Sequence, residues 1–259
     1  MRLYQCYATR NACYQANGEL EPKGIMVHST GANNPNLSRY VQPDDGNLGN
    51  NPNGNHFNVP LPGGRQVCVH AFIGKLADGT IATYQTLPWT MRGWHAGGSA
   101  NNTHIGFEIC EDGLDDPIYF AKVYREAAEL CAYLCREFHL TERDIICHSE
   151  GHQKGIASNH ADVMHWFPKH GKNMDIFRND VGKILNGTES EELDMTKEEL
   201  VSVTGTGDNP SAWAREAVAW AKENEIINGD GEGNYGWQQP ITREAFATVL
   251  HNFKEYLGK

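Results

Sequence analysis

The chain has 259 residues, enough for one large domain or for one medium and one small domain. Hydrophobic residues make up 39% and charged residues 21%, as in ordinary globular proteins, and the absence of any run of about 18 apolar residues excludes a membrane span. A net charge of −11 argues against nucleic acid as a partner.

The acidic excess is concentrated near the C-terminus. From Glu189 onward there are fourteen acidic and six basic residues, which leaves the preceding part nearly neutral and predicts a second domain. The N-terminal residues Met1–Cys6 lack the apolar core of a secretory signal, so we expect synthesis and retention in the cytoplasm unless another route releases the protein. The seven cysteines form no Cys-x-x-Cys pair, so we expect them to be reduced and mostly buried.

The first predicted strand, Gly24–Val27, ends at His28. Because sites in α/β sheets gather at the carboxyl ends of strands, His28 is a candidate metal ligand, and the alternative is a satisfied core histidine. Residues 35–42 fit one or two helical turns. Residues 43–64 are rich in Asn, Gly, Pro and Asp, and we expect them to form a long loop that walls a groove.

A hairpin is predicted next, with strands at residues 67–74 and 81–87 joined by the turn Asp78-Gly79. The loop that follows contains Trp94 and His95 beside two glycines. Such a loop either grips a sugar or peptide, or lets Trp94 fill the core. Residues 103–110 form the third clear strand, in which Glu108 interrupts an apolar run. Burying this carboxylate unpaired costs several kcal/mol, so it faces water, a cation or a metal, unless it points outward from an edge strand. The apolar setting would raise its pKa and suit a general base.

Asp116-Pro117 begins a predicted helix of about five turns, with apolar residues three and four apart up to Phe138. A buried strand at residues 144–147 and a final helix at residues 172–185 complete the order of strand, hairpin, strand, helix, strand and helix. The fold class is therefore α/β.

The stretch Cys147–Trp166 holds four histidines and two carboxylates, a composition that indicates a zinc site, the alternative being a His-rich polar loop. A mononuclear zinc hydrolase needs three ligands, an open position and a separate general base. His28 and His148 supply two ligands at converging strand ends, beside Glu108. The candidates for the third ligand are Asp162, Glu150, His152 and His160. Gly151 argues against a helical His-Glu-x-x-His-like site and predicts an irregular segment.

The sequence resembles the zinc-dependent N-acetylmuramoyl-L-alanine amidases related to small phage lysozymes and animal peptidoglycan recognition proteins. The matching segments are Gly24–Gly31, Trp94–Gly97, Asn101–Cys110 and Cys147–Trp166. Over residues 1–186 the resemblance implies a central mixed β-sheet flanked by helices. It also implies that His28, His148 and Asp162 bind Zn²⁺ and that Glu108 is the catalytic base.

The activity implied by this resemblance is hydrolysis of the amide bond between N-acetylmuramic acid and L-alanine of peptidoglycan, by zinc-activated water with Glu108 as general base. Relatives often have Lys two residues before the third ligand, where this chain has His160. We expect His160 to stabilise the oxyanion, with Lys154 as the alternative. The expected substrate-binding residues are Trp94, His95, Asn102 and Lys154.

Residues 187–210 are polar and are expected to form a linker. Residues 211–259 are expected to form a small helical domain, with one helix capped by Ser211 and a second capped by Thr242. This part resembles a single S-layer homology motif at residues 213–220, 226–229 and 241–246. The resemblance implies binding to a secondary cell-wall polymer, and the alternative is a module for homo-oligomerisation.

Together these features favour a phage or prophage endolysin that lacks a signal peptide and reaches the wall after holin-type release. The alternatives are a non-catalytic peptidoglycan-binding protein and a cytoplasmic recycling amidase. The presence of both Asp162 and Glu108 argues against the first alternative, and the wall-binding-like tail argues against the second.

Overall fold

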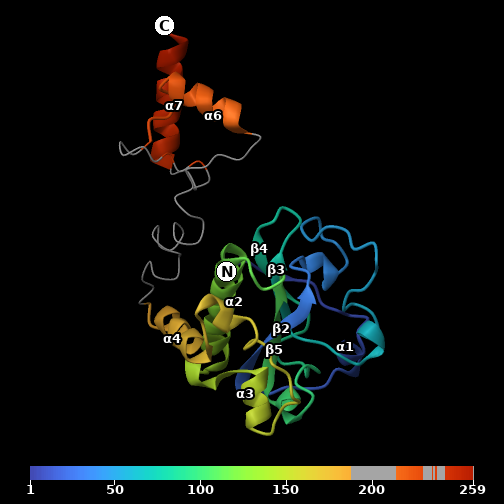
Figure 1. The fold of residues 1–259 in the computed structure, drawn as a ribbon. Helices are drawn as coiled ribbons and strands as arrows, with labels where there is room; N and C mark the ends of the chain where they lie inside the picture. Colours follow the sequence, from blue (N-terminus) through green and yellow to red (C-terminus); the bar gives the residue numbers. More distant parts are fainter. Residues whose placement is uncertain (188–213, 230–234, 236, 238–242, 259) are drawn as a thin grey trace. The chain divides into compact units, whose positions relative to one another are not determined.

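The computed structural model describes residues 1–187, 214–229, 235, 237 and 243–258. The chain divides into two compact units, Met1–Leu193 and Asp194–Lys259 (Figure 1). Almost all of the expected linker, residues 188–210, lies outside the described residues, as do the expected helix caps Ser211 and Thr242. Of the helices in the described parts, none is both long and apolar enough to cross a membrane.

The first unit is built on one mixed β-sheet with the order β1-β4-β3-β5-β2-β6. β3 and β4 pair antiparallel, and the other neighbouring strands pair parallel. This arrangement confirms the predicted mixed sheet, and the predicted hairpin is the β3–β4 pair. The strands are β1 (Leu3–Gln5), β2 (Gly24–Asn33), β3 (Ala71–Lys75), β4 (Ile81–Gln85), β5 (His104–Glu111) and β6 (Ile145–Cys147).

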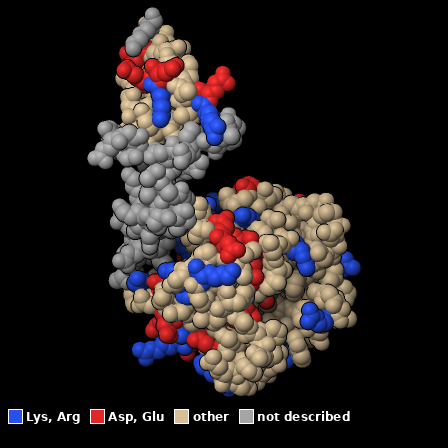
Figure 2. Space-filling view, in the orientation of Figure 1, with Lys and Arg blue, Asp and Glu red and all other residues tan. Residues whose placement is uncertain are grey.

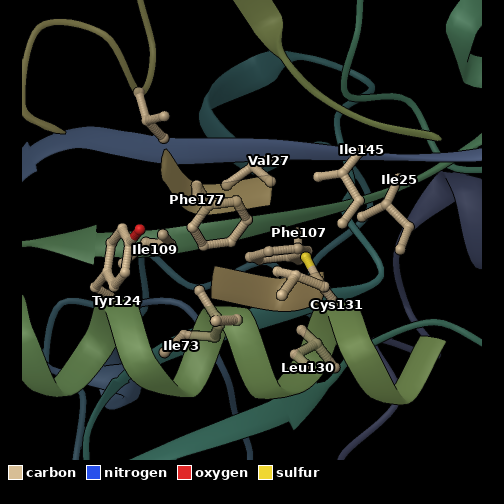
Figure 3. Close-up of a cluster of buried hydrophobic side chains, with 14 of the residues drawn as sticks. Ile25, Val27, Ile73, Phe107, Ile109, Tyr124, Leu130, Cys131, Ile145 and Phe177 are labelled. Carbon is tan, nitrogen blue, oxygen red and sulfur yellow. The ribbon is translucent and has the colours of Figure 1, made fainter. Parts of the chain in front are cut away.

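Two long helices, α2 (Pro117–Phe138) and α4 (Met174–Leu185), pack against each other and against the sheet. The Asp116 carboxylate caps α2 by accepting hydrogen bonds from the backbone N–H groups of residues 118 and 119, as its sequence predicts. α4 begins two residues later than predicted because the Asn173 side chain caps it by accepting from Ile176 N–H. Figure 3 shows the resulting core, in which Phe107 of β5 lies among side chains from the sheet and α2.

The sheet presents its other face to the candidate site. Ile25 and Val27 of β2 point into the core beneath α2, so the alternation of a strand sends His28 to the opposite face. His28 is paired with Glu108 in the parallel register of β2 and β5, and Val27 is paired with Cys147 of β6. β2 continues to Asn33, beyond its predicted end at Val27, so His28 lies within this strand, and Glu108 likewise lies within β5 and not at its end.

The segment after β6 is helical, contrary to the irregular structure predicted from its glycines. α3 (His148–Gln153) starts directly at the end of β6. A Cβ atom at Gly151 would lie 2.7 Å from Cε of Met26 in β2, the flexible end of that side chain, so Met26 would have to shift if this residue had a side chain. Gly151 therefore lies close against Met26 on this face of the sheet.

The N-terminal region contains structure that the sequence pattern did not predict. β1 extends the sheet beside β4, and α1 (Ala12–Ala16) follows it. Cys13 of α1 forms a disulfide with Cys68, so the expectation that every cysteine is reduced is wrong. The two residues are distant in sequence, and only the folded chain brings them together. The other five cysteines are free, and all but Cys6 are buried.

The second unit contains α6 (Arg215–Glu223) and α7 (Arg243–Leu257). The Trp220 ring of α6 lies 5.4 Å from the Tyr256 ring of α7, centroid to centroid, and Asn252 Nδ2 donates to Ile226 O at 3.1 Å. α7 also exposes apolar side chains, at Phe246, Leu250 and Leu257.

Arg178 links α4 to α3 and to strand β6. Its guanidinium forms two 3.0 Å hydrogen bonds with the Glu150 carboxylate of α3 and donates to Ile145 O at 3.1 Å. Glu150 in turn accepts from Cys147 N–H at 3.1 Å. Both side chains are largely shielded from water, so this bidentate pair contributes more than a surface ion pair.

We expect Arg178→Met to lower the free energy of unfolding by about 1–3 kcal/mol, because it leaves a part-buried carboxylate and a carbonyl without their donor. Arg143→Met is the matched control. It removes an exposed arginine whose ion pair is with the adjacent Glu142, and its effect should stay within about 0.5 kcal/mol. Urea unfolding of both variants measures this difference. Equal effects would show that the Arg178 pair adds no stability.

Candidate metal centre and active site

Three potential ligand atoms converge on the face of the sheet opposite α2. Nδ1 of His28 lies 3.0 Å from Oδ2 of Asp162 and 3.1 Å from Nδ1 of His148. His148 Nδ1 and Asp162 Oδ2 are 3.6 Å apart. Strands β2 and β6 position the two histidines, and the chain after α3 returns to place Asp162 beside them. The structure therefore has a His-His-Asp group that could hold a metal ion.

The spacing of these atoms fits a small tetrahedral ion. Zinc binds nitrogen and oxygen ligands at about 2.0–2.1 Å, which separates neighbouring ligand atoms by roughly 3.3–3.4 Å in a tetrahedron. The observed separations of 3.0, 3.1 and 3.6 Å bracket this value. Two imidazole nitrogens and one carboxylate oxygen are also a usual donor set for catalytic zinc.

Electrostatics favours the metal-binding states of His28 and Asp162. Burial lowers the pKa of His28 below its ordinary value, although Asp162 acts in the opposite direction. Burial alone would raise the pKa of Asp162, but the adjacent rings of His148 and His28 outweigh it and lower that pKa. A neutral imidazole and an ionised carboxylate result, and both have lone pairs free for a cation.

Glu108 lines the same cavity, which has a volume of about 230 Å³. Its Oε2 atom is buried and makes no hydrogen bond within the described part of the chain. Burial raises the pKa of Glu108 well above its ordinary value, and the nearby charges of Asp162 and Glu111 raise it further. A buried carboxyl oxygen without a partner beside three metal-type ligands is suited to exchange a proton with a molecule in the cavity.

His160 also lines the cavity, and Lys154 does not. His160 Nδ1 is 3.1 Å from Ser158 Oγ, and its ring centroid is 4.6 Å from that of His148. Lys154 is exposed at the C-terminal end of α3. Of the two residues considered for oxyanion stabilisation, the structure therefore brings His160 to the site.

Comparison with known proteins places this site in a family. Residues 18–165 match the N-acetylmuramoyl-L-alanine amidase family, which is more than half of the chain. The chain belongs to this family. Residues 208–247 match the S-layer homology domain, in the part where the sequence resembles that motif.

Individual relatives resemble parts of this chain. The N-acetylmuramoyl-L-alanine amidase XlyA of Bacillus subtilis (strain 168) is 40% identical over 68 residues, which span 25% of this chain and 22% of that protein. The structure of the Staphylococcus aureus hydrolase AmiA in complex with its ligand has a TM-score of 0.50 at 19% identity, covering 71% of this chain and 83% of that one. The XlyA catalytic domain has a TM-score of 0.49 at 22% identity, covering 70% of this chain and 100% of that domain. The AmiA comparison supports the mixed-sheet fold.

The four residues expected to bind substrate occupy different positions in the amidase unit. Trp94 lines the cavity with its side chain exposed, and the Arg92 guanidinium lies 4.9 Å from its ring centroid. Asn102 is outside the cavity lining and accepts from Arg92 Nε at 2.6 Å, so its side chain orients Arg92. His95 lines the cavity, but both of its ring nitrogens already have partners within the chain, and Lys154 lies outside the lining.

The other ligand candidates are engaged elsewhere or exposed. Glu150 pairs with Arg178, and His152 is an exposed residue of α3. His165, which the His-rich stretch also contains, lies 2.9 Å from Glu111 through its Nε2 atom. Of the four candidates for the third ligand, only Asp162 belongs to the His-His-Asp group found among the described residues.

Two polar side chains of the cavity, those of Arg65 and Ser158, were not anticipated from sequence. Arg65 directly follows the glycine-rich loop, where no spacing distinguishes it. Ser158 lies two residues before His160 and contacts both His148 and His160 through its Oγ atom. A hydroxyl near a histidine in sequence is a weak signal, since only the folded loop shows which ring it contacts.

His70 is a buried histidine whose ring contacts that of His95, and its pKa can be tested. Its Nε2 lies 2.8 Å from Met91 O, and its Nδ1 accepts from Gly106 N–H at 3.0 Å. Burial lowers the pKa of His70 from 6.5 to about 4, against the smaller opposing effect of its backbone hydrogen bonds. The unfolded chain therefore binds more protons than the folded chain in this range, and stability falls as the pH falls from 6.5 toward 4.

Because of His70, we expect the free energy of unfolding of the wild type to be about 2 kcal/mol lower at pH 5.0 than at pH 7.5. His70→Gln should remove this part of the pH dependence, because its amide does not titrate. His152→Gln, at an exposed histidine, should keep the wild-type slope. Urea unfolding with chelator at the two pH values gives the comparison, and identical slopes for wild type and His70→Gln would contradict it.

Proposed function

We propose that this chain is a peptidoglycan hydrolase that cleaves the amide bond between N-acetylmuramic acid and the L-alanine of the stem peptide. The observation that carries this proposal is the location of the unpartnered Glu108 oxygen in the same cavity as His28, His148 and Asp162. Membership in the amidase family supplies the substrate class. A metal-type triad beside a buried base is the arrangement that metal-assisted amide hydrolysis uses.

The metal we propose is zinc, held by His28, His148 and Asp162. When bound there, zinc would polarise the scissile carbonyl and increase the acidity of a water molecule. Its positive charge would also offset the electrostatic cost of placing two carboxylates, Glu108 and Asp162, around one cavity. The fit of the donor set and of its spacing supports this choice of metal.

The side chains of the cavity would divide the remaining work. Glu108 would take the proton from the attacking water and return it to the leaving amine of L-alanine. His160 would donate a hydrogen bond to the oxygen of the scissile carbonyl as negative charge develops on it. Trp94 would offer an exposed aromatic face to the sugar or the peptide, stiffened by the Arg92 side chain stacked on it.

Glu108→Gln separates catalysis from metal binding. The amide keeps the shape of the side chain but cannot accept the proton, so we expect wall digestion to fall by about 100-fold or more while zinc content is unchanged. Asp162→Asn should instead lower zinc content itself. Glu142→Gln, at the start of the turn before β6, is the matched control and should digest walls at the wild-type rate.

Release of new L-alanine amino groups from purified walls measures the activity, and elemental analysis measures the zinc. If Glu108→Gln digests walls at the wild-type rate, Glu108 is not the general base. A zinc-free wild type that still digests walls would remove the metal from the mechanism. A protein that retains zinc and binds walls without releasing amino groups would favour the alternative, a non-catalytic recognition protein.

We further propose that the C-terminal unit directs the enzyme to the wall, by binding a secondary cell-wall polymer or by self-association. The S-layer homology match at residues 208–247 supports wall attachment, and the exposed apolar side chains of α7 support association. The whole chain would then act as a phage or prophage endolysin that reaches the peptidoglycan after holin-type release. A cytoplasmic recycling enzyme would have no use for a wall-binding unit.

Sedimentation with defined walls tests this attachment on the full chain. We expect most of the protein to sediment with intact walls and several-fold less with walls stripped of secondary polymer by hydrofluoric acid. Light scattering of the free protein reports its oligomeric state. Equal sedimentation with both kinds of wall would contradict polymer binding, and a monomer would contradict self-association.

A further inference from the structure

We propose that His95 is a positioning residue that fixes the tautomer of His28, so that the bare Nδ1 atom of His28 faces the metal centre. The imidazole of His95 lies between His28 and the backbone of β5. This inference rests on the proposed function only in requiring that the site binds a metal. It assigns His95 a role different from the substrate contact expected from its sequence context.

The backbone of β5 supplies His95 with a partner that can act only as a hydrogen-bond acceptor. His95 Nε2 lies 3.1 Å from the carbonyl oxygen of His104, which can only accept a hydrogen bond. The proton of a neutral His95 ring is therefore on Nε2, and its Nδ1 atom is an acceptor. His28 Nε2 lies 2.9 Å from that Nδ1 atom and must be the donor. A neutral His28 then has no proton on Nδ1, the atom that faces Asp162 and His148.

The ring of His95 is held in place from two sides. A Cβ atom at Gly106 of β5 would lie 2.4–2.5 Å from three atoms of this ring, so only glycine lets it approach the strand. On the other side, the Asn101 amide oxygen accepts from the backbone N–H groups of both His95 and Ala96 at 2.8 Å. Asn101 is itself buried, so the loop has little freedom to withdraw the ring.

The second histidine ligand has a partner of a different kind. His148 Nε2 lies 3.1 Å from Ser158 Oγ, which lies 3.2 Å from Ala96 O. The Ser158 hydroxyl donates its one proton to Ala96 O, so it accepts from His148 Nε2 and leaves Nδ1 of a neutral His148 bare as well. Both chains of hydrogen bonds therefore end on a backbone carbonyl oxygen. Outer hydrogen-bond partners of this type orient ligating histidines, and their loss typically costs about 10–100-fold in metal affinity.

Zinc affinity of the full-length protein tests the relay, by which we mean the hydrogen bonds from His28 through His95 to His104 O, without reference to catalysis. We expect His95→Leu, which fills the space but accepts no hydrogen bond, to weaken zinc binding by about 10–100-fold in competition with a chromophoric chelator. His95→Asn retains an amide oxygen that can accept from His28, and it should recover most of the affinity. His152→Leu, at an exposed histidine of α3, is the control and should bind zinc as the wild type does.

A merely structural role of His95 makes a different prediction. In that case the Leu and Asn variants would lose affinity together, in proportion to their loss of thermal stability. Wild-type zinc affinity in His95→Leu would overturn the relay while leaving the proposed function intact. No zinc binding by the wild type would instead overturn the proposed function.

The tautomers can also be read in the wild-type protein, which avoids any doubt about folding of the variants. In metal-free protein with ¹⁵N-labelled histidine, long-range ¹H–¹⁵N correlation spectra distinguish a protonated Nε2 from a protonated Nδ1. We expect both His28 and His95 to have the proton on Nε2 at neutral pH. A proton on Nδ1 of His28 would overturn the inference.

Discussion

Three lone pairs that point at one another are the constraint around which this molecule is arranged. Nδ1 of His28, Nδ1 of His148 and Oδ2 of Asp162 face each other at 3.0–3.6 Å, and buried imidazole and carboxylate groups at such distances have unfavourable electrostatics unless protons or a cation lie between them. The relay through His95 keeps the proton of His28 on the far side of its ring. A cation is therefore the partner that suits this geometry best.

Strand pairing and close packing produce this geometry. Parallel pairing of β2 with β5 and β6 brings residues from three distant parts of the chain onto one face of the sheet. The opposite face is sealed by α2 and α4, so the strands are anchored by apolar packing that the site does not have to provide (Figure 3). Gly106 has no side chain that would keep the His95 ring away from β5.

Charge is distributed differently between the site and the surface. On the face of the first unit shown in Figure 2, Lys and Arg side chains are scattered among Asp and Glu side chains. The cavity itself is lined by carboxylates and imidazoles, with Arg65 as its one lining arginine or lysine among the described residues. Such a cavity favours a cation, and the exposed Arg65 leaves one positive group for a substrate.

The amino-acid sequence alone indicated the fold class, most of the sheet and the identity of the chemical groups. The apolar periodicity and the Asp116-Pro117 cap defined α2, the interrupted apolar run singled out Glu108, and a few short motifs indicated the amidase family. These signals are local, because capping, periodicity and motif chemistry depend on neighbouring residues. The same local reasoning missed β1, α1 and the disulfide between Cys13 and Cys68, whose pairing depends on distant segments.

Only the tertiary structure decided how the candidate residues are used. It brought Asp162, and not Glu150 or His152, to the two histidines, because α3 turns Glu150 toward Arg178 and leaves His152 exposed. It also engaged His95 with His28 and Asn102 with Arg92, where sequence indicated only that such side chains could bind something. Sequence determined which groups are present, whereas hydrogen-bond partners and distances arise when remote strands and loops pack together, and no local pattern encodes them.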